Sequence, residues 1–312
     1  MQDPASLRIG CVKYLNARPL VRGWAGQVEF DHPSLLCQRL AAGELEVALV
    51  SSFEFLRNPI YTIVDGIAIA SDGPVYSVVL AHRGDLSRIN EIALDPAAVT
   101  SVALLRCLLA QRGLNPRLVA RGDLEKRAQR EALGSAGCQP AVAGSLPATP
   151  SGTPRASKST RTSRQAAETD RPAAGARQTS SFTDAAQLLI GDQAIHFRQK
   201  HGEGLEYWDL GEQWKKRFDL SFVYALWLIR PEVSDAKAIA DRLRALRDEN
   251  LANLDALIAT EKDFDQDFCA VYYRDYLRFH FGEKEKKGLR LFQELCAKHD
   301  LLPGREIEFR LV

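Results

Sequence analysis

The apolar run Val47-Ala-Leu-Val50 constrains the fold more than any other stretch, because it is a strand without a polar face. A segment with leucines at helical spacing precedes it, with Ser34 as the expected N-cap and Gly43 as the expected stop. A strand that is apolar on both faces and follows a helix is typical of a parallel sheet covered on both sides. The sequence therefore predicts an α/β protein.

The rest of the chain continues this alternation and then becomes helical. We expect further strands at residues 7–12, 91–94, 187–190 and 221–229, a turn followed by a strand within 72–80, and a helix at about 102–112. From Ser234 onward apolar residues repeat at helical spacing, which predicts helices that include 267–279 and 283–298. The first of these carries four aromatic residues at helical spacing, which we interpret as core: Phe268, Tyr272, Tyr276 and Phe279.

Composition and charge argue against several classes of partner. With 312 residues, 46% of them apolar, the chain can bury the core of one large domain or of two lobes. The 41 basic and 40 acidic side chains nearly cancel, so the net charge provides no field for nucleic acid or an anionic membrane. A charged ligand must therefore be recognised locally, and the oligomeric state stays open.

The cysteines and the first residues indicate the compartment. Six cysteines without a CxxC pair favour a reducing environment. The start of the chain lacks the apolar core of a signal peptide, and no window approaches the roughly 20 apolar residues of a membrane span. We therefore expect a cytoplasmic protein without membrane contact.

One segment departs from the α/β pattern. Residues 134–181 contain no aromatic side chain and little beyond Ala, Ser, Thr, Pro, Gly and charged residues. Such a composition cannot bury enough apolar surface to fold alone. Its mild positive charge leaves open a tail that binds a partner. We interpret the stretch at about 123–183 as a disordered surface insertion without a dedicated role.

Polar groups follow several predicted strands, at the end where open α/β sheets bind their ligands. Asn16 and Arg18 come after the first strand and are not required by any core. The other candidates follow later strands or turns: Ser51, Ser52, Ser77, Gly191 and Asp192. Small polar groups that converge in this way predict one ligand-binding crevice.

Thr100 and Ser101 stand at the start of a predicted helix. Hydroxyls and free backbone amides at such a position can hold a carboxylate or a phosphate against the positive helix end. N-capping without ligand contact explains the same two residues. Both interpretations stay open at the level of sequence.

No metal or cofactor site is expected. The six histidines lack the spacing of zinc motifs, and no glycine-rich nucleotide motif is present. His196 follows Gly191-Asp192 and could serve as a general base, but a lone histidine in a loop is more often structural. We therefore leave His196 out of the catalytic set.

Five motifs occur in a fixed order along the chain. They are Tyr14-Leu-Asn-Ala-Arg-Pro-Leu20, Gly43-Glu-Leu-Glu-Val-Ala-Leu-Val-Ser-Ser-Phe-Glu54, Ala70-Ser-Asp-Gly-Pro-Val-Tyr-Ser77, Thr100-Ser-Val-Ala-Leu-Leu105 and Leu189-Ile-Gly-Asp192. In order and spacing they resemble the chorismate dehydratase family of menaquinone biosynthesis. The stretch Gly288-Leu-Arg-Leu-Phe-Gln-Glu-Leu295 is similar to that family as well, whereas Lys13 departs from it, because the family often has a small residue there.

The resemblance implies a type II periplasmic-binding-protein fold, in which two α/β lobes hold the substrate in the cleft between them. On this chain, residues 1–79 and 230–312 would form lobe one, and residues 80–229 would form lobe two with the insertion on its surface. The crossings between the lobes would fall near Val79 and Ile229.

The resemblance also implies an enzyme without metal or cofactor, which removes water from chorismate to give 3-[(1-carboxyvinyl)oxy]benzoate in the futalosine route to menaquinone. The residue most tied to catalysis in the family carries over to Asn16. Our hypothesis is that Asn16 positions the departing hydroxyl or the substrate, while the enolpyruvyl carboxylate of chorismate takes the C3 proton. Ser77, Thr100 and Ser101 would bind carboxylates. The cleft would be lined by Ser51, Ser52, Gly191 and Asp192, with Arg18 either a counter-charge or a brace for its loop.

Two alternatives accompany this interpretation. A sister enzyme of the same route, which makes 1,4-dihydroxy-6-naphthoate, shares the fold and would be expected to offer a histidine base in the cleft. A non-enzymatic binding protein for a small carboxylate is the alternative from another class.

Overall fold

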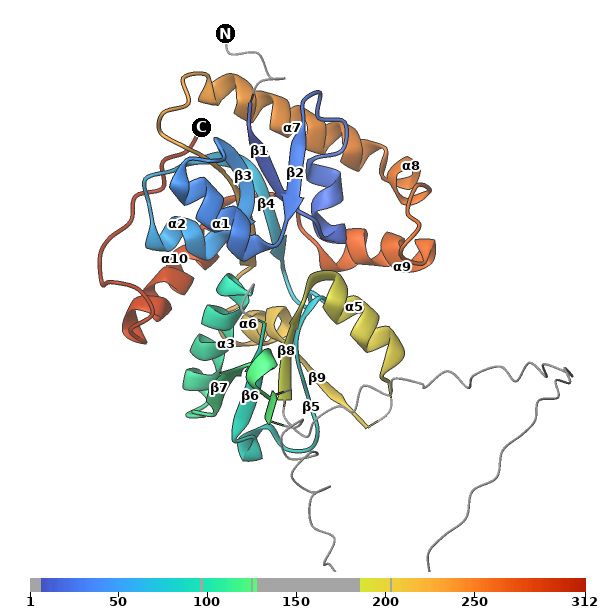
Figure 1. The fold of residues 1–312 in the computed structure, drawn as a ribbon, viewed down its shortest axis with the longest axis vertical. Coiled ribbons are helices and arrows are strands. Elements are labelled where there is room, and N and C mark those ends of the chain that lie inside the picture. The colour runs from blue at the N-terminus through green and yellow to red at the C-terminus, as the bar shows by residue number, and fades with distance from the viewer. Residues whose placement is uncertain (1–6, 96–97, 125, 128–185, 203) are drawn as a thin grey trace, which may run out of the picture. The chain divides into compact units, whose positions relative to one another are not determined.

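Two mixed five-stranded sheets form the framework of the computed structural model, which describes residues 7–95, 98–124, 126–127, 186–202 and 204–312 (Figure 1). Both sheets belong to one unit, made of Met1–Glu125 and Asp184–Val312. The expected α/β class is confirmed within the described residues. The expected insertion at about 123–183 lies almost entirely outside them.

The first sheet has the strand order β2-β1-β3-β10-β4. Its strands are β1 (Ile9–Val12), β2 (Val28–Asp31), β3 (Val47–Ser51), β4 (Thr62–Ser71) and β10 (Phe222–Ile229). β1 pairs in parallel with β2 and β3, whereas β10 runs antiparallel between β3 and β4. Every residue of β3 is buried, as the apolar run predicts.

The second sheet has the strand order β7-β6-β8-β5-β9. Its strands are β5 (Val78–His82), β6 (Glu91–Leu94), β7 (Arg117–Ala120), β8 (Ala186–Ile190) and β9 (Glu206–Asp209). β6 pairs in parallel with β7 and β8, and β5 runs antiparallel to β8 and β9. Like the first sheet, this sheet has an antiparallel strand between two neighbours.

Two connections join the sheets. The first runs from β4 to β5, so it lies between Ser71 and Val78, next to the expected crossing near Val79. The second runs from β9 to β10, so it lies between Asp209 and Phe222. The expected crossing near Ile229 differs from the structure, because β10 pairs along its length with β3 and β4 of the first sheet.

Helices pack on both sheets (Figure 1). Those in contact with the first sheet are α1 (Pro33–Ala42), α2 (Ser52–Arg57), α6 (Leu210–Phe218), α7 (Ala236–Ala252) and α10 (Glu283–Lys298). The second sheet is contacted by α5 (Gly191–Lys200) and α6 (Leu210–Phe218), and α3 (Val99–Gln111) packs against α2, α6 and α10. Shorter elements are the 3-10 helices η2 (Leu15–Leu20) and η3 (Leu86–Arg88), α8 (Leu254–Ile258), α9 (Gln266–Val271) and a π-helical turn, η4 (Tyr272–Tyr276).

Three helical expectations change in detail. α1 begins at Pro33 after His32, so Ser34 is not its N-cap, although the stop at Gly43 is confirmed. α3 begins at Val99, earlier than expected, which places Thr100 and Ser101 in its first turn. The helix expected over 267–279 stops being α-helical after Val271 and continues as the π-helical turn.

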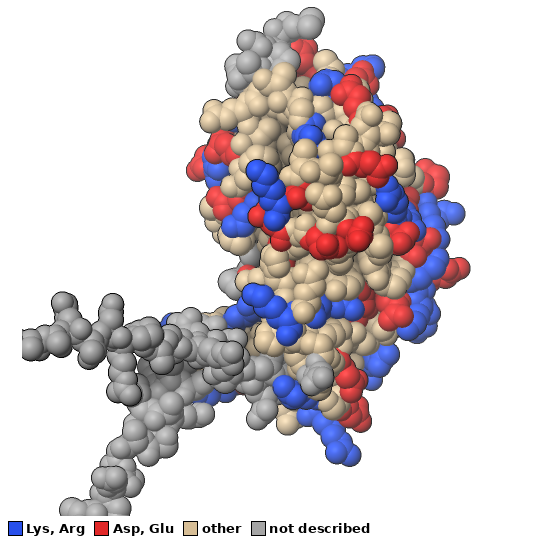
Figure 2. All heavy atoms as spheres, turned by 90° about the vertical axis from the view of Figure 1, so that its right-hand side faces the viewer, with Lys and Arg blue, Asp and Glu red and all other residues tan. Residues whose placement is uncertain are grey.

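Charged side chains of both signs are distributed over the surface. Figure 2 shows acidic and basic groups interspersed on one face, as their nearly equal numbers predict. Within the described part of the chain, no helix is both long enough and apolar enough to cross a membrane.

The packing of α10 on the start of β10 depends on a glycine. A Cβ atom at Gly288 would overlap the carbonyl oxygen of Ser221, which belongs to the main chain just before β10. We expect Gly288→Ala to lower the free energy of unfolding by about 2 kcal/mol, because overpacking against backbone is relieved only by moving the strand. The better helix propensity of alanine offsets about 1 kcal/mol of the steric cost.

Urea unfolding of the purified variants measures this effect. Gly122→Ala is the matched control, since a Cβ atom there meets nothing within 4 Å. Equal stability of the two variants would contradict the proposed packing constraint.

Candidate functional site

A cavity of about 60 Å³ is lined by residues from both sheets. Its apolar walls come from strand residues such as Val12, Ile69 and Ile190. Its polar lining consists of Tyr14, Asn16, Ser51, Ser77, Thr100, Ser101 and Tyr224. Among the described residues that line the cavity, none carries a charged side chain.

Six of the nine residues predicted from sequence line this cavity. They are Asn16, Ser51, Ser77, Thr100, Ser101 and Gly191. The other three, Arg18, Ser52 and Asp192, are close in sequence to lining residues but make other contacts. The sequence therefore identified the strand ends that meet, but not every side chain that faces inward.

Asn16 presents a buried acceptor to which no described residue donates a hydrogen bond. Its backbone neighbour Leu15 is held on both sides: the Leu15 N–H donates to Asp192 Oδ1 (2.8 Å), and the Leu15 carbonyl accepts from the Tyr273 hydroxyl (3.0 Å). The Asn16 Oδ1 atom itself is buried and has no hydrogen-bond partner among the described residues. An unsatisfied buried polar atom costs about 1–3 kcal/mol, so a ligand that donates a hydrogen bond here would be favoured.

At the start of α3, which faces the cavity, no side chain of the described residues caps the backbone amides. The N-cap residue Ala98 makes no side-chain hydrogen bond, so the N-capping explanation for Thr100 and Ser101 does not apply to α3. Thr100 Oγ1 instead contacts Ser51 Oγ and accepts from the Phe53 N–H (3.2 Å) in the first turn of α2. The positive end of α3 is therefore available to a negatively charged ligand.

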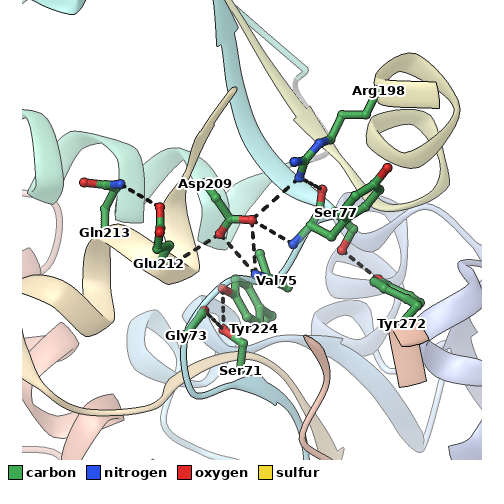
Figure 3. Close-up of polar contacts among 11 residues, drawn as sticks. Ser71, Gly73, Val75, Ser77, Arg198, Asp209, Glu212, Gln213, Tyr224 and Tyr272 are labelled. Atoms are coloured by element: carbon green, nitrogen blue, oxygen red, sulfur yellow. Dashed lines mark hydrogen bonds and ion pairs between the residues drawn. The ribbon is translucent and has the colours of Figure 1, made fainter. Parts of the chain in front are cut away.

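Ser77 is held by the tightly fixed turn that leads into β5 (Figure 3). Tyr76 has a φ of 66°, in the left-handed region that non-glycine residues seldom adopt. The Asp209 carboxylate accepts from the N–H groups of Val75 (3.1 Å) and Tyr76 (2.8 Å). Arg198 donates to the Tyr76 carbonyl (3.0 Å) and lies over the Tyr76 ring, 3.9 Å from its centroid.

Asp209 also accepts a hydrogen bond from the Glu212 N–H (3.1 Å) and so acts as the N-cap of α6. Burial raises the pKa of Asp209, and the three backbone donors and the Arg198 charge oppose that rise. One carboxylate thus joins the end of β9 to the turn that places Ser77.

The first two residues of α5 bring that helix against the Asn16 loop. A Cβ atom at Gly191, where φ is 57°, would lie 2.8 Å from the Tyr14 ring, so only glycine permits this approach. Asp192 accepts from Leu15 as described above, and burial raises its pKa. Asp192 therefore anchors the loop from outside the cavity.

The remaining candidates also have structural contacts. Arg18 forms ion pairs with Glu261 and Asp263 (3.1 Å to the latter), which agrees with the alternative that it braces its loop. Ser52 donates to the Val223 carbonyl (2.7 Å) and ties α2 to β10. The His196 ring stacks on Phe264 with 4.6 Å between centroids and does not line the cavity.

Sequence reasoning missed three tyrosines at the site, of which Tyr14 lines the cavity beside Gly191. Tyr224 in β10 lines the cavity, and its hydroxyl hydrogen-bonds to Ser71 Oγ (3.0 Å). Tyr272 donates to Ser77 Oγ (2.7 Å) from the segment interpreted as aromatic core. The feature of the sequence that could have identified these residues is the tyrosine hydroxyl, because a buried tyrosine requires a hydrogen-bond partner and a buried phenylalanine does not.

We expect Asp209→Ala to destabilise the fold by about 3 kcal/mol, since three backbone N–H groups would lose their acceptor. Asp209→Asn keeps one acceptor oxygen and should lose less. Urea unfolding at neutral pH measures both variants, and an alanine variant as stable as the asparagine variant would refute this role of the carboxylate.

Known proteins agree with this architecture. The family model described as menaquinone biosynthesis matches residues 7–137 and 159–298. A chorismate dehydratase of Thermus thermophilus is 28% identical over 293 residues, which covers 92% of this chain and 93% of that protein. A solved structure from Archaeoglobus fulgidus has a TM-score of 0.61 at 16% identity and covers 95% of this chain and 98% of its own.

The periplasmic aliphatic sulphonate binding protein of Escherichia coli has a TM-score of 0.54 at 14% identity, covering 99% of this chain and 97% of its own. These likenesses confirm the expected two-lobed, periplasmic-binding-protein-like α/β fold. Because the family model matches well over half of the chain, the protein belongs to the menaquinone biosynthesis family.

Proposed function

We propose that this protein is a cytoplasmic chorismate dehydratase, which converts chorismate to 3-[(1-carboxyvinyl)oxy]benzoate and water in the futalosine route to menaquinone. The observation that carries the proposal is the buried Asn16 Oδ1, which has no partner among the described residues, at a cavity lined by hydroxyls and the start of α3. Family membership and the similarity to the Thermus thermophilus chorismate dehydratase support it. The buried free cysteines of the described residues fit a reducing compartment.

The reaction requires little chemistry from the protein. The C3–H and C4–O bonds break, a C3–C4 double bond forms, and the ring becomes aromatic as water leaves. Aromatisation supplies the driving force, so orientation and fixed dipoles can lower the barrier. The enolpyruvyl carboxylate of the substrate takes the C3 proton in this proposal, because it is attached to the same carbon through the ether oxygen.

Asn16 has the role of orienting the C4 hydroxyl. An amide is not a strong base, but its free Oδ1 can accept the hydroxyl hydrogen and fix the direction of the C4–O bond. This hydrogen bond gives the buried Asn16 Oδ1 a partner, and it offsets part of the free energy that the substrate hydroxyl loses when it leaves water. Asn16 therefore acts by position and not by proton abstraction.

The two substrate carboxylates meet dipoles in this cavity. No described lining residue is Lys or Arg. We therefore assign the binding of the substrate carboxylates to the start of α3 and to the hydroxyls of Ser77, Thr100 and Ser101. The cavity of about 60 Å³ is smaller than the roughly 300 Å³ of small-molecule pockets. Binding therefore requires contacts across the cavity, such as Ser51 of β3 with Thr100 of α3, to separate and form again around the substrate.

The two alternatives receive less support. A 1,4-dihydroxy-6-naphthoate synthase would be expected to use a histidine base, and no histidine among the described residues lines the cavity. A non-enzymatic carboxylate-binding protein would fit the same hydroxyls but gives no reason for an unpartnered acceptor beside them. Turnover of chorismate distinguishes these alternatives from the proposal.

Asn16→Ala tests the central residue. We expect the purified wild type to form the enolpyruvyl benzoate from chorismate, and the variant to lose about 100-fold or more in kcat, because the leaving hydroxyl is no longer oriented. Product is measured by chromatography and mass. Asn58→Ala, which removes an amide that donates to Tyr61 away from the cavity, is the control and should retain turnover. Tight chorismate binding without product in the wild type would favour a binding protein.

Asp192 offers a second test at the edge of the site. Asp192→Ala leaves the Leu15 N–H without its acceptor, and we expect kcat/KM to fall about 10-fold because the Asn16 loop is no longer anchored. Asp192→Asn keeps an acceptor and should stay near the wild-type value. Equal losses in both variants would mean that the charge of Asp192, rather than this hydrogen bond, is required.

A further inference from the structure

A second cavity adjoins the cavity that Asn16 lines. Its volume is about 490 Å³, within the roughly 300–1,000 Å³ of small-molecule pockets. Val12 and Tyr14 line both cavities, so the two spaces meet where β1 ends. A molecule that is too large for the closed Asn16 cavity therefore has room directly beside it.

The second cavity has apolar walls. They come from the neighbouring strands β1 and β2, from η2 and from the end of α8 (Figure 1). Val21, Val28, Leu257 and Phe30 supply the apolar surface, and Phe30 is 55% exposed. Such walls suit a ligand with an apolar ring.

Two basic side chains of the second cavity have no carboxylate partner among the described residues. Lys13 Nζ donates to His32 Nε2 (3.1 Å), which accepts because an ammonium group has only donors. Arg22 donates to the carbonyl of Ala256 (3.3 Å). Both contacts leave the positive charge uncompensated, so this cavity attracts anions.

The other polar groups of the lining do not cancel this charge. Glu261 is ion-paired with Arg18, so these two side chains compensate each other. Trp24 Nε1 is buried at the wall and has no acceptor among the described residues. Because an unsatisfied donor favours a ligand that accepts a hydrogen bond, the lining as a whole suits a carboxylate.

The position of these charges matters because the described lining of the Asn16 cavity carries none. Dipoles and hydroxyls act over short distances, whereas full charges raise the local concentration of a dianion before it binds. Tyr14 packs against Gly191 at the start of α5. Separation of these two residues would join the second cavity to the Asn16 cavity.

We propose that the second cavity is the entry site for chorismate, in which Lys13 and Arg22 hold a substrate carboxylate before the substrate moves into the Asn16 cavity. The inference rests on the proposed dehydratase function, because that function assigns the dianion. Lys13 and Arg22 act on the rate of association and not on the elimination of water.

Lys13→Met tests the entry site, since it removes the charge and keeps an unbranched side chain. Chorismate binding is followed in a stopped-flow instrument by tryptophan fluorescence, because Trp24 lines the second cavity. We expect the association rate constant to fall about 5- to 10-fold at low ionic strength, with kcat within about twofold of the wild type. Arg22→Gln should act in the same direction. Lys287→Met is the matched control, because Lys287 is an exposed residue of α10 that lines neither cavity.

Salt separates a charge effect from a structural one. In about 1 M sodium chloride the difference between the wild type and Lys13→Met should disappear, and Lys13→Arg should associate at the wild-type rate in low salt. Unchanged association in Lys13→Met would overturn the inference, and so would a loss that persists in high salt or a fall in kcat alone. Wild-type protein that binds chorismate with this salt dependence but forms no product would count against the dehydratase function and not against the entry site.

Discussion

The Asp209 carboxylate is the interaction on which the geometry of the site depends. It accepts the backbone N–H groups of Val75 and Tyr76, and it caps α6 through Glu212. The turn between the two sheets contains a non-glycine residue in the left-handed region, which costs about 1–3 kcal/mol unless its surroundings impose it. Asp209 and Arg198 supply that constraint, and Ser77 is the next residue along the chain. A structural carboxylate outside the cavity thus determines where a hydroxyl inside it lies.

A cavity whose described lining carries no charged side chain suits a dianion that must react after binding. Lys or Arg would bind the carboxylates of the substrate strongly in the ground state, and in our proposal one of those carboxylates must remain basic enough to take the C3 proton. Hydroxyls and the start of α3 hold negative charge with fixed dipoles and without an ion pair. The cation expected from sequence as a possible counter-charge, Arg18, is instead neutralised by Glu261 and Asp263. The electrostatic design therefore favours positioning over tight binding.

The sequence predicted the parts of this structure that depend on local patterns. Apolar runs located the strands, and polar residues after the ends of β1 and β3 located Asn16 and Ser51, because neighbouring strand ends of one sheet edge meet in space. The turn before β5 located Ser77. Sequence could not show that Ser52 turns toward β10, since adjacent residues point in different directions and only packing decides which one faces the cavity. The crossing expected at Ile229 was misplaced because strand periodicity does not reveal which sheet a strand joins. Tyr272 was hidden because helical aromatic spacing is the same for a core residue and for one whose hydroxyl reaches a site.

In our proposal the contacts across the cavity must be strong enough to orient the substrate and weak enough to release it. The polar contacts at this position include Asp192 with Leu15 and Thr100 with Ser51, and each net hydrogen bond contributes about 1 kcal/mol. Tyr14 against Gly191 adds close packing without a charge. Interactions of this size can be exchanged for contacts to a bound substrate without a large barrier, whereas a buried ion pair in their place would be costly to break. Asp192, which takes part in these contacts, also holds the backbone of Leu15 next to Asn16, so in our proposal closure of the cavity and alignment of the Asn16 amide occur together.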